Sequence, residues 1–89
     1  MKSGLYSLYD KKAEYHSKPV PMQNDDIAMR SIKNTMYDEQ SKDTDFVKNP
    51  EDFTLVRVGF FDDGKGTLTE EYKPLVDLIT LVKGEKDEK

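Results

Sequence analysis

The sequence predicts a small α+β protein in which an antiparallel sheet of three to four strands packs against one main helix, with a short C-terminal helix. Three observations predict this fold. A short aromatic run opens the chain, an amphipathic segment with a helix-start signal follows, and two β-forming runs flank a glycine-containing loop. The 89 residues are enough for one modest core. We therefore expect a single domain over residues 1–84 and a charged, flexible tail over residues 85–89.

The first strand is expected over residues 5–9, "LYSLY", which are aromatic and apolar. Residues 14–16 would return beside it as a short second strand. Pro19 and Pro21 then restrict the chain to a sheet edge or a connector, because proline lacks the backbone N–H that a central strand needs.

The main helix is expected over residues 25–39. Asn24 is a good N-cap, and Asp25 and Asp26 would lie in the first turn, where the helix dipole favours negative charge. The buried side is predicted from helical spacing to carry Ala28, Met29, Ile32, Thr35 and Met36. A polar loop follows, and Pro50 would start a single turn.

The central strand is expected over residues 53–61, with a return strand over residues 67–72. Strict alternation would put Thr54, Val56, Val58 and Phe60 on one face, and Phe53, Leu55, Arg57, Gly59 and Phe61 on the other. Gly59 indicates a bulge or a close approach by another element. Residues 75–83 fit a helix that starts at Pro74 and ends at Gly84, although their β-branched residues also fit a buried strand.

The composition excludes several classes of protein. No cysteine is present, so there is no disulfide, no thiolate nucleophile and no cysteine zinc site. No apolar run reaches the roughly 18 residues of a membrane helix, and the start of the chain lacks the pattern of a signal peptide. We expect a soluble intracellular protein that does not contact a membrane.

The acidic loop "DDGKG" and the single histidine are the features that most resemble a chemical site. An EF-hand register fails, since Gly64 and Gly66, or else Lys65, would fall at ligand positions. A hairpin loop is the simpler interpretation. His16 lacks the partners that a general base or a metal site needs. We therefore expect no catalytic residue, no metal and no cofactor.

The N-terminal end is the best candidate for a binding surface. Residues 1–22 carry four lysines and two acidic residues, whereas the rest of the chain has ten basic and sixteen acidic residues. Bases stack on aromatic rings while lysines contact phosphates. The predicted nucleic-acid-binding set is Tyr6, Tyr9, Lys11, Lys12, Tyr15 and Lys18. The net charge of −4 limits such binding to a weak interaction with single-stranded DNA.

Three blocks of sequence, in this order and spacing, resemble one family. They are "LYSLYDKKAEYHSKPVPMQND", "IAMRSIKN" and "NPEDFTLVRVGFFDDGKGTL". The matching positions are Tyr9, Asp10, Pro19, Asn24, Ala28, Arg30, residues 49–53, Gly59, Phe61, Asp62 and Gly66. The set is similar to the small nonstructural protein of gokushovirus-like microviruses, which are phages with single-stranded DNA genomes. The resemblance covers nearly the whole chain up to Tyr72.

The resemblance implies a non-enzymatic phage protein in the host bacterial cytoplasm, linked to replication or packaging of the single-stranded genome. Its partners would be phage replication or packaging proteins, with single-stranded DNA as a further candidate. A structural interaction module, such as a homodimer with no nucleic-acid contact, is the alternative.

Overall fold

The computed structural model describes the backbone of residues 1–87 and the side chains of residues 1–82. Within these residues one antiparallel sheet contains β1 (Lys2–Asp10), β2 (Tyr15–His16), β3 (Val20–Met22), β4 (Phe53–Asp62) and β5 (Thr67–Asp77). The long strands run in the order β1-β4-β5, and both β2 and β3 pair with the outer edge of β1. The helices are α1 (Asp25–Met36), α2 (Asp45–Lys48) and α3 (Leu78–Asp87), with 3₁₀ turns at Glu39–Ser41 and Pro50–Asp52.

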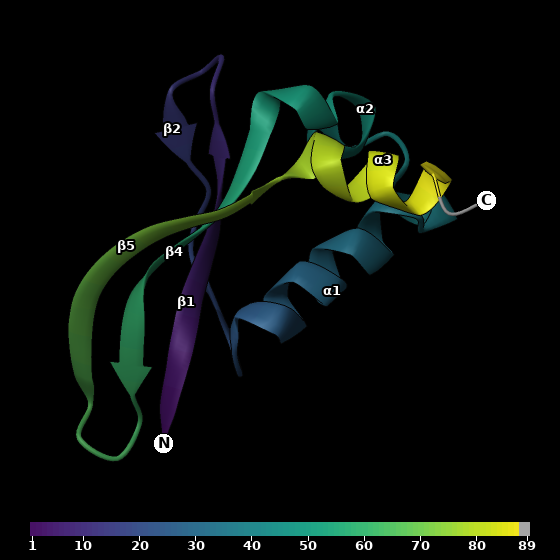
Figure 1. The fold of residues 1–89 in the computed structure, drawn as a ribbon. Coiled ribbons are helices and arrows are strands. Elements are labelled where there is room, and N and C mark those ends of the chain that lie inside the picture. The colour runs from purple at the N-terminus through teal and green to yellow at the C-terminus, as the bar shows by residue number, and fades with distance from the viewer. Residues whose placement is uncertain (88–89) are drawn as a thin grey trace.

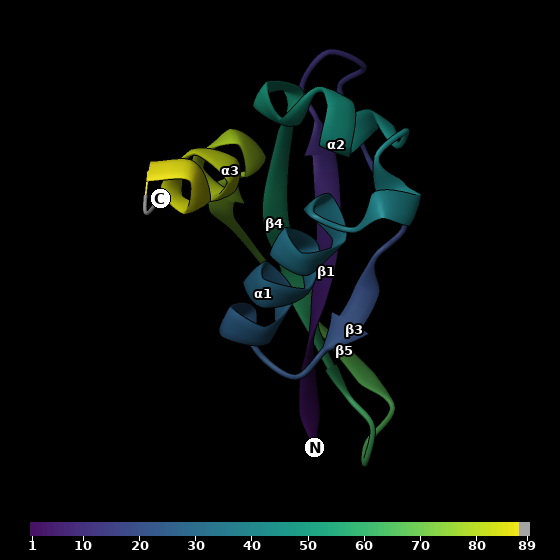
Figure 2. The same ribbon diagram turned by 90° about the vertical axis from the view of Figure 1, so that its right-hand side faces the viewer.

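All three helices lie on the same side of the sheet, as Figures 1 and 2 show from two directions. The centre of the core joins β1 and β4 to α1 and α3, through Tyr6, Ala28, Met36, Leu55 and Leu78. The α+β class is confirmed. The sheet has five strands instead of three or four, because the short β2 and β3 both pair with β1. α1 shares the covering of the sheet with α3, so one main helix does not do this alone.

Helix α1 forms where the sequence predicts it. The Asn24 side chain accepts a hydrogen bond from the Ile27 backbone N–H at 2.9 Å, which is the expected N-cap. Ala28 and Met36 are buried, as predicted from their spacing. The helix ends three residues earlier than expected, and Asp38 instead caps the 3₁₀ turn that follows. The expected polar loop after it contains the short helix α2.

A β-bulge changes the alternation of side chains in β4. Leu5 pairs with Gly59 and Tyr6 pairs with Arg57, which leaves Val58 as the extra residue. The bulge moves later residues to the opposite face, so the Arg57 guanidinium lies 4.6 Å from the centre of the Phe60 ring. The prediction that Arg57 and Phe60 lie on opposite faces was therefore wrong.

Gly59 has both of the roles that the sequence predicts for it. It adjoins the bulge, and a Cβ atom at this position would collide with the backbone carbonyl oxygen of Thr69 on β5. Only glycine allows the two strands to approach this closely.

The C-terminal segment is strand first and helix afterwards. β5 continues to Asp77, and α3 begins at Leu78, so the helix predicted over residues 75–83 starts three residues too early. Pro74 lies inside β5 opposite Val56, on an edge strand, where proline is tolerated. Gly84 does not end the helix, which runs to Asp87 and so includes the first part of the expected tail. Residues 88–89 of that tail lie outside the described residues.

Candidate functional site

The sheet divides the predicted nucleic-acid-binding residues between its two faces. Side chains alternate along β1, so Tyr6 lies on the helix-covered face and Tyr9 on the helix-free face. Tyr6 is 2% exposed, and its hydroxyl donates a hydrogen bond to Asp25 Oδ1 at 2.8 Å. Its ring belongs to the core, which removes Tyr6 from any surface that could stack on a base.

The other predicted residues are also dispersed. Tyr15 pairs with Asp10 on the helix-covered side and is exposed, whereas the next residue, His16, pairs with Tyr9. Lys11 Nζ lies 3.7 Å from Asp77, and Lys12 Nζ lies 3.9 Å from Asp52, while Lys18 is exposed. The six residues therefore do not form one continuous surface.

The helix-free face carries a different aromatic group, formed by Tyr9, His16 and Tyr72. The Tyr9 and His16 rings are 4.6 Å apart, and the His16 and Tyr72 rings meet edge to face at 5.6 Å. A hydrogen bond of 2.9 Å joins His16 Nε2 to the Tyr72 hydroxyl. The bridge spans the sheet from β2 to β5, across the two strands between them. We call these three residues the aromatic bridge.

Sequence reasoning found only Tyr9 of the aromatic bridge. His16 was considered as a general base or a metal ligand, and it is exposed in the short strand β2. Tyr72 lies 56 residues further along the chain, in the predicted return strand, whose position relative to the strand of His16 was not predicted from the sequence. No local pattern could have brought these two residues together.

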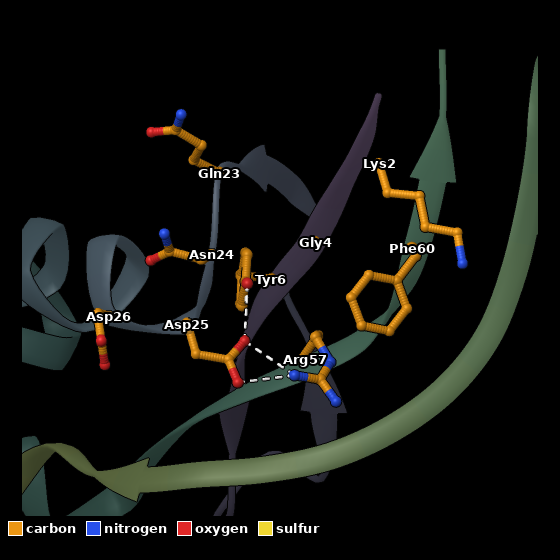
Figure 3. A pocket seen from close by; sticks show the side chains of 9 residues that line it. All are labelled: Lys2, Gly4, Tyr6, Gln23, Asn24, Asp25, Asp26, Arg57 and Phe60. Atoms are coloured by element: carbon orange, nitrogen blue, oxygen red, sulfur yellow. Dashed lines mark hydrogen bonds and ion pairs between the residues drawn. The ribbon is translucent and has the colours of Figure 1, made fainter. Parts of the chain in front are cut away.

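A second candidate site lies on the helix-covered side, where a cavity of about 410 Å³ adjoins the start of α1 (Figure 3). Its polar centre is Asp25, whose carboxylate accepts two hydrogen bonds from Arg57 Nη1, at 2.9 and 2.7 Å, besides the one from Tyr6. Arg57 is only 8% exposed, and its Nη2 lies 3.5 Å from Glu71. The Arg57 Nε atom is buried without a hydrogen-bond partner, beside the Phe60 ring.

The surroundings of Asp25 and Tyr6 shift the pKa of each side chain away from neutral pH. Burial alone would raise the pKa of Asp25, but the hydrogen bonds from Tyr6 and Arg57, with the charges of Arg57 and Lys73, lower it overall. Burial, and then the hydrogen bond to Asp25, raises the pKa of Tyr6 to about 12. Near neutral pH Asp25 is ionised and Tyr6 is protonated, so neither is suited to exchange a proton during a reaction.

The Asp25–Arg57 pair was missed by sequence reasoning, although a signal for it existed. An arginine inside a strand with two apolar faces must find an anion when it is buried. Asp25 was assigned only to the helix dipole. Its position at the start of α1 also brings its carboxylate to Arg57.

The acidic loop is a hairpin, as its glycines predict. Asp62 Oδ1 accepts hydrogen bonds from the backbone N–H groups of Gly64 and Lys65, at 3.0 and 3.2 Å. Gly66 has a φ angle of +67°, which suits glycine. The carboxylate of Asp62 therefore stabilises the turn.

The chain is similar to phage proteins along nearly its whole length. Residues 3–84 match the family described as Phage ORF5 protein. The chain is 33% identical over 79 residues to Protein ORF5 of Chlamydia phage 1, covering 86% of this chain and 78% of that protein. No solved structure matches. Among the described residues, no helix is long and apolar enough to cross a membrane.

These similarities confirm the resemblance found in the ordered sequence blocks. Residues 49–62, which carry most of the third of these blocks, form the 3₁₀ turn Pro50–Asp52 and β4 in the structure, and they lie within the matched region. The chain belongs to the Phage ORF5 protein family, as a nonstructural protein of the gokushovirus type.

Proposed function

We propose that this protein is a non-catalytic accessory protein for replication or packaging of a single-stranded phage genome in the host bacterial cytoplasm. It would bind single-stranded DNA weakly through the helix-free face of its sheet. The observation that carries the proposal is the aromatic bridge, whose rings lie together on a sheet face that no helix of residues 1–87 covers. Family membership provides the setting.

Exposed rings on a sheet are a common way to bind single strands, because every base has a face that can stack. Tyr72 is 52% exposed and therefore accessible to a base. Stacking of this kind contributes about 1–3 kcal/mol per base. Phosphate contacts would be few, since Lys11 already lies beside Asp77 and the net charge is −4. Binding should therefore be weak and sensitive to salt.

The absence of catalysis is part of the proposal. In the cavity beside the start of α1, hydrogen bonds join Asp25 to Arg57 and to Tyr6, and they favour the ionised form of Asp25 and the protonated form of Tyr6. This arrangement supports a structural role for the cavity. The protein would act through contacts with DNA and with phage replication or packaging proteins.

A binding titration with fluorescently labelled oligothymidine at low salt tests the proposal. Replacing Tyr72 with alanine should raise the Kd roughly fivefold, which corresponds to about 1 kcal/mol of lost stacking. Tyr37→Ala is the matched control, because Tyr37 is 50% exposed but lies in the helix layer. Circular dichroism checks that both variants are folded. No binding at low salt, or equal losses in the two variants, would refute this surface.

A further inference from the structure

Three neighbouring cavities on the helix-covered side lie beside the outer edge of β1 and share wall residues. Their volumes are about 180, 220 and 250 Å³. The first and second share Leu8, Ser17 and Phe46 in their walls. The second and third share Asp10, Asp45 and Phe53. We call this row of three cavities the β1 groove.

One end of the β1 groove is apolar. Its walls come from β3, α1, α2 and β4, and they include Val20, Met22, Ile32, Phe46 and Leu55. Val20 is 51% exposed at the rim, which leaves apolar surface open to solvent. An exposed apolar hollow of this kind is suited to take aliphatic or aromatic side chains of a binding partner.

The backbone at the floor of the groove is already satisfied. The Leu8 N–H donates to Ser17 Oγ at 2.9 Å, and the Ser17 N–H donates to the Leu8 carbonyl oxygen at 3.0 Å. Ser17 thus fills the gap between β2 and β3 along β1. A partner in this groove would be held through its side chains, because β1 has no free ladder position here.

The other end of the β1 groove is acidic. Asp10, Asp45 and Asp52 line it, and among the side chains of residues 1–82 Lys12 is the one basic side chain in its wall. Lys12 Nζ lies 3.9 Å from Asp52, so these four side chains together carry a charge of −2. Such an end repels phosphate and attracts lysine or arginine.

We infer that the β1 groove binds a segment of a partner protein. This segment would have a group of apolar side chains next to a group of basic side chains. The apolar side chains would enter beside Val20 and Phe46, and the basic ones would reach Asp45 and its acidic neighbours. The groove lies on the opposite side of the sheet from the aromatic bridge. This second contact is therefore independent of the proposed DNA contact.

Selection from a library of random peptides tests this inference, with the folded full-length protein as the target. Peptides that bind the wild type should be enriched in sequences with an apolar block beside a block of Lys or Arg. The selected peptides are then measured against three single variants. Val20→Lys alters the apolar end, Asp45→Lys reverses charge at the acidic end, and Asp43→Lys makes the same reversal at an exposed position outside the groove.

The expected result is that Val20→Lys and Asp45→Lys each weaken peptide binding at least roughly fivefold. Asp43→Lys should leave the Kd within about twofold of the wild-type value. Absence of enrichment, or equal weakening by Asp43→Lys and Asp45→Lys, would overturn the inference.

Light scattering at increasing protein concentration gives a separate check. If the protein self-associates and Val20→Lys abolishes this self-association, the β1 groove binds a second copy of this chain, and the inference of a different partner protein is wrong. Tyr72→Ala, which should weaken DNA binding, should leave peptide binding to the β1 groove unchanged.

Discussion

Arg57 is the residue whose surroundings most constrain this fold. It is a buried cation in a chain whose core has few large apolar side chains, and its guanidinium is held between Asp25, Glu71 and the Phe60 ring. A buried ion pair is not a large source of stability when it is intact. Removing one partner is costly, because the remaining charge stays buried without compensation.

We predict that Asp25→Ala lowers the free energy of unfolding by about 3 kcal/mol, because the buried Arg57 would lose both short hydrogen bonds to Asp25 and keep only its 3.5 Å contact with Glu71. Urea denaturation followed by circular dichroism measures this change. Asp26→Ala is the matched control, since Asp26 is exposed in the same helical turn. Its loss should cost only about 0.5 kcal/mol from the helix dipole. Similar decreases in the free energy of unfolding in the two variants would contradict a specific stabilising role of the Asp25–Arg57 pair.

The raised pKa of Tyr6 predicts that the folded protein loses stability at alkaline pH. Its pKa is about 12 in the folded protein, against 10.0 for an unperturbed tyrosine. Between these values the unfolded chain releases the Tyr6 proton while the folded chain keeps it, so stability falls as the pH rises from 10 to 12. Tyr6→Phe cannot lose this proton, and its stability should fall less over that range.

The measurement is urea unfolding of the wild type and Tyr6→Phe at about pH 9 and about pH 11. The change in the free energy of unfolding between the two pH values is compared in the two proteins. The difference between these changes reports on Tyr6 alone, because the other tyrosines and the lysines titrate in both proteins. Parallel decreases in both proteins would contradict the raised pKa of Tyr6.

Among the elements, α1 and β4 show how far local sequence determines this fold. The cap at Asn24 and the spacing of Ala28 and Met36 predict α1, and the structure confirms them. The span of β4 is also predicted well, and it ends one residue later than expected. The face that each side chain occupies is not predicted, because the bulge at Val58 depends on pairing with a strand fifty residues earlier. Alternation is reliable only as far as the ladder is regular.

We predict that Gly59→Ala lowers the free energy of unfolding by about 2–3 kcal/mol, because the added methyl group would push β5 away from β4. Gly64→Ala is the control, in the exposed hairpin loop, where the nearest atom to an added Cβ is Asp62 Oδ1 at 3.4 Å. Its effect should stay within about 0.5 kcal/mol. Thermal unfolding of both variants distinguishes the two outcomes. A tolerated Gly59→Ala would mean that the strands separate easily at this point.

For the whole molecule, the two edges of the sheet decide whether strands can join between copies. β5 forms one edge, and it carries Glu70, Glu71, Lys73 and Pro74. The other edge is broken between β2 and β3, where Pro19 lies, and Pro21 is the middle residue of β3 itself. Charges and prolines on edges oppose pairing with another strand.

We therefore predict that the isolated protein does not dimerise through its sheet edges and has the monomer mass of 10.3 kDa. Light scattering after size-exclusion chromatography measures this over a range of concentrations. A stable dimer that dissociates when Lys73 or Glu70 is replaced would contradict the prediction and would favour the homodimer interpretation of the sequence.

The candidate sites were the least predictable part of the molecule. The N-terminal tyrosines and lysines are close in sequence, yet alternation along β1 and β2 sends them to opposite sides of the sheet. The aromatic bridge and the β1 groove both join residues from strands or helices far apart in the chain. Their existence depends on the order of the strands, which composition and periodicity do not encode.

The placement of the two surfaces on opposite sides of a single sheet has a genetic consequence. Adjacent residues of β1, such as Leu8 and Tyr9, belong to different surfaces, so point mutations can impair one contact and spare the other. Phage alleles of the two classes, for example Tyr72→Ala and Val20→Lys, can be supplied together in one infected cell. Mutual rescue would mean that the two contacts are made by different copies of the protein. Failure to rescue would mean that each working copy must hold both ligands at once.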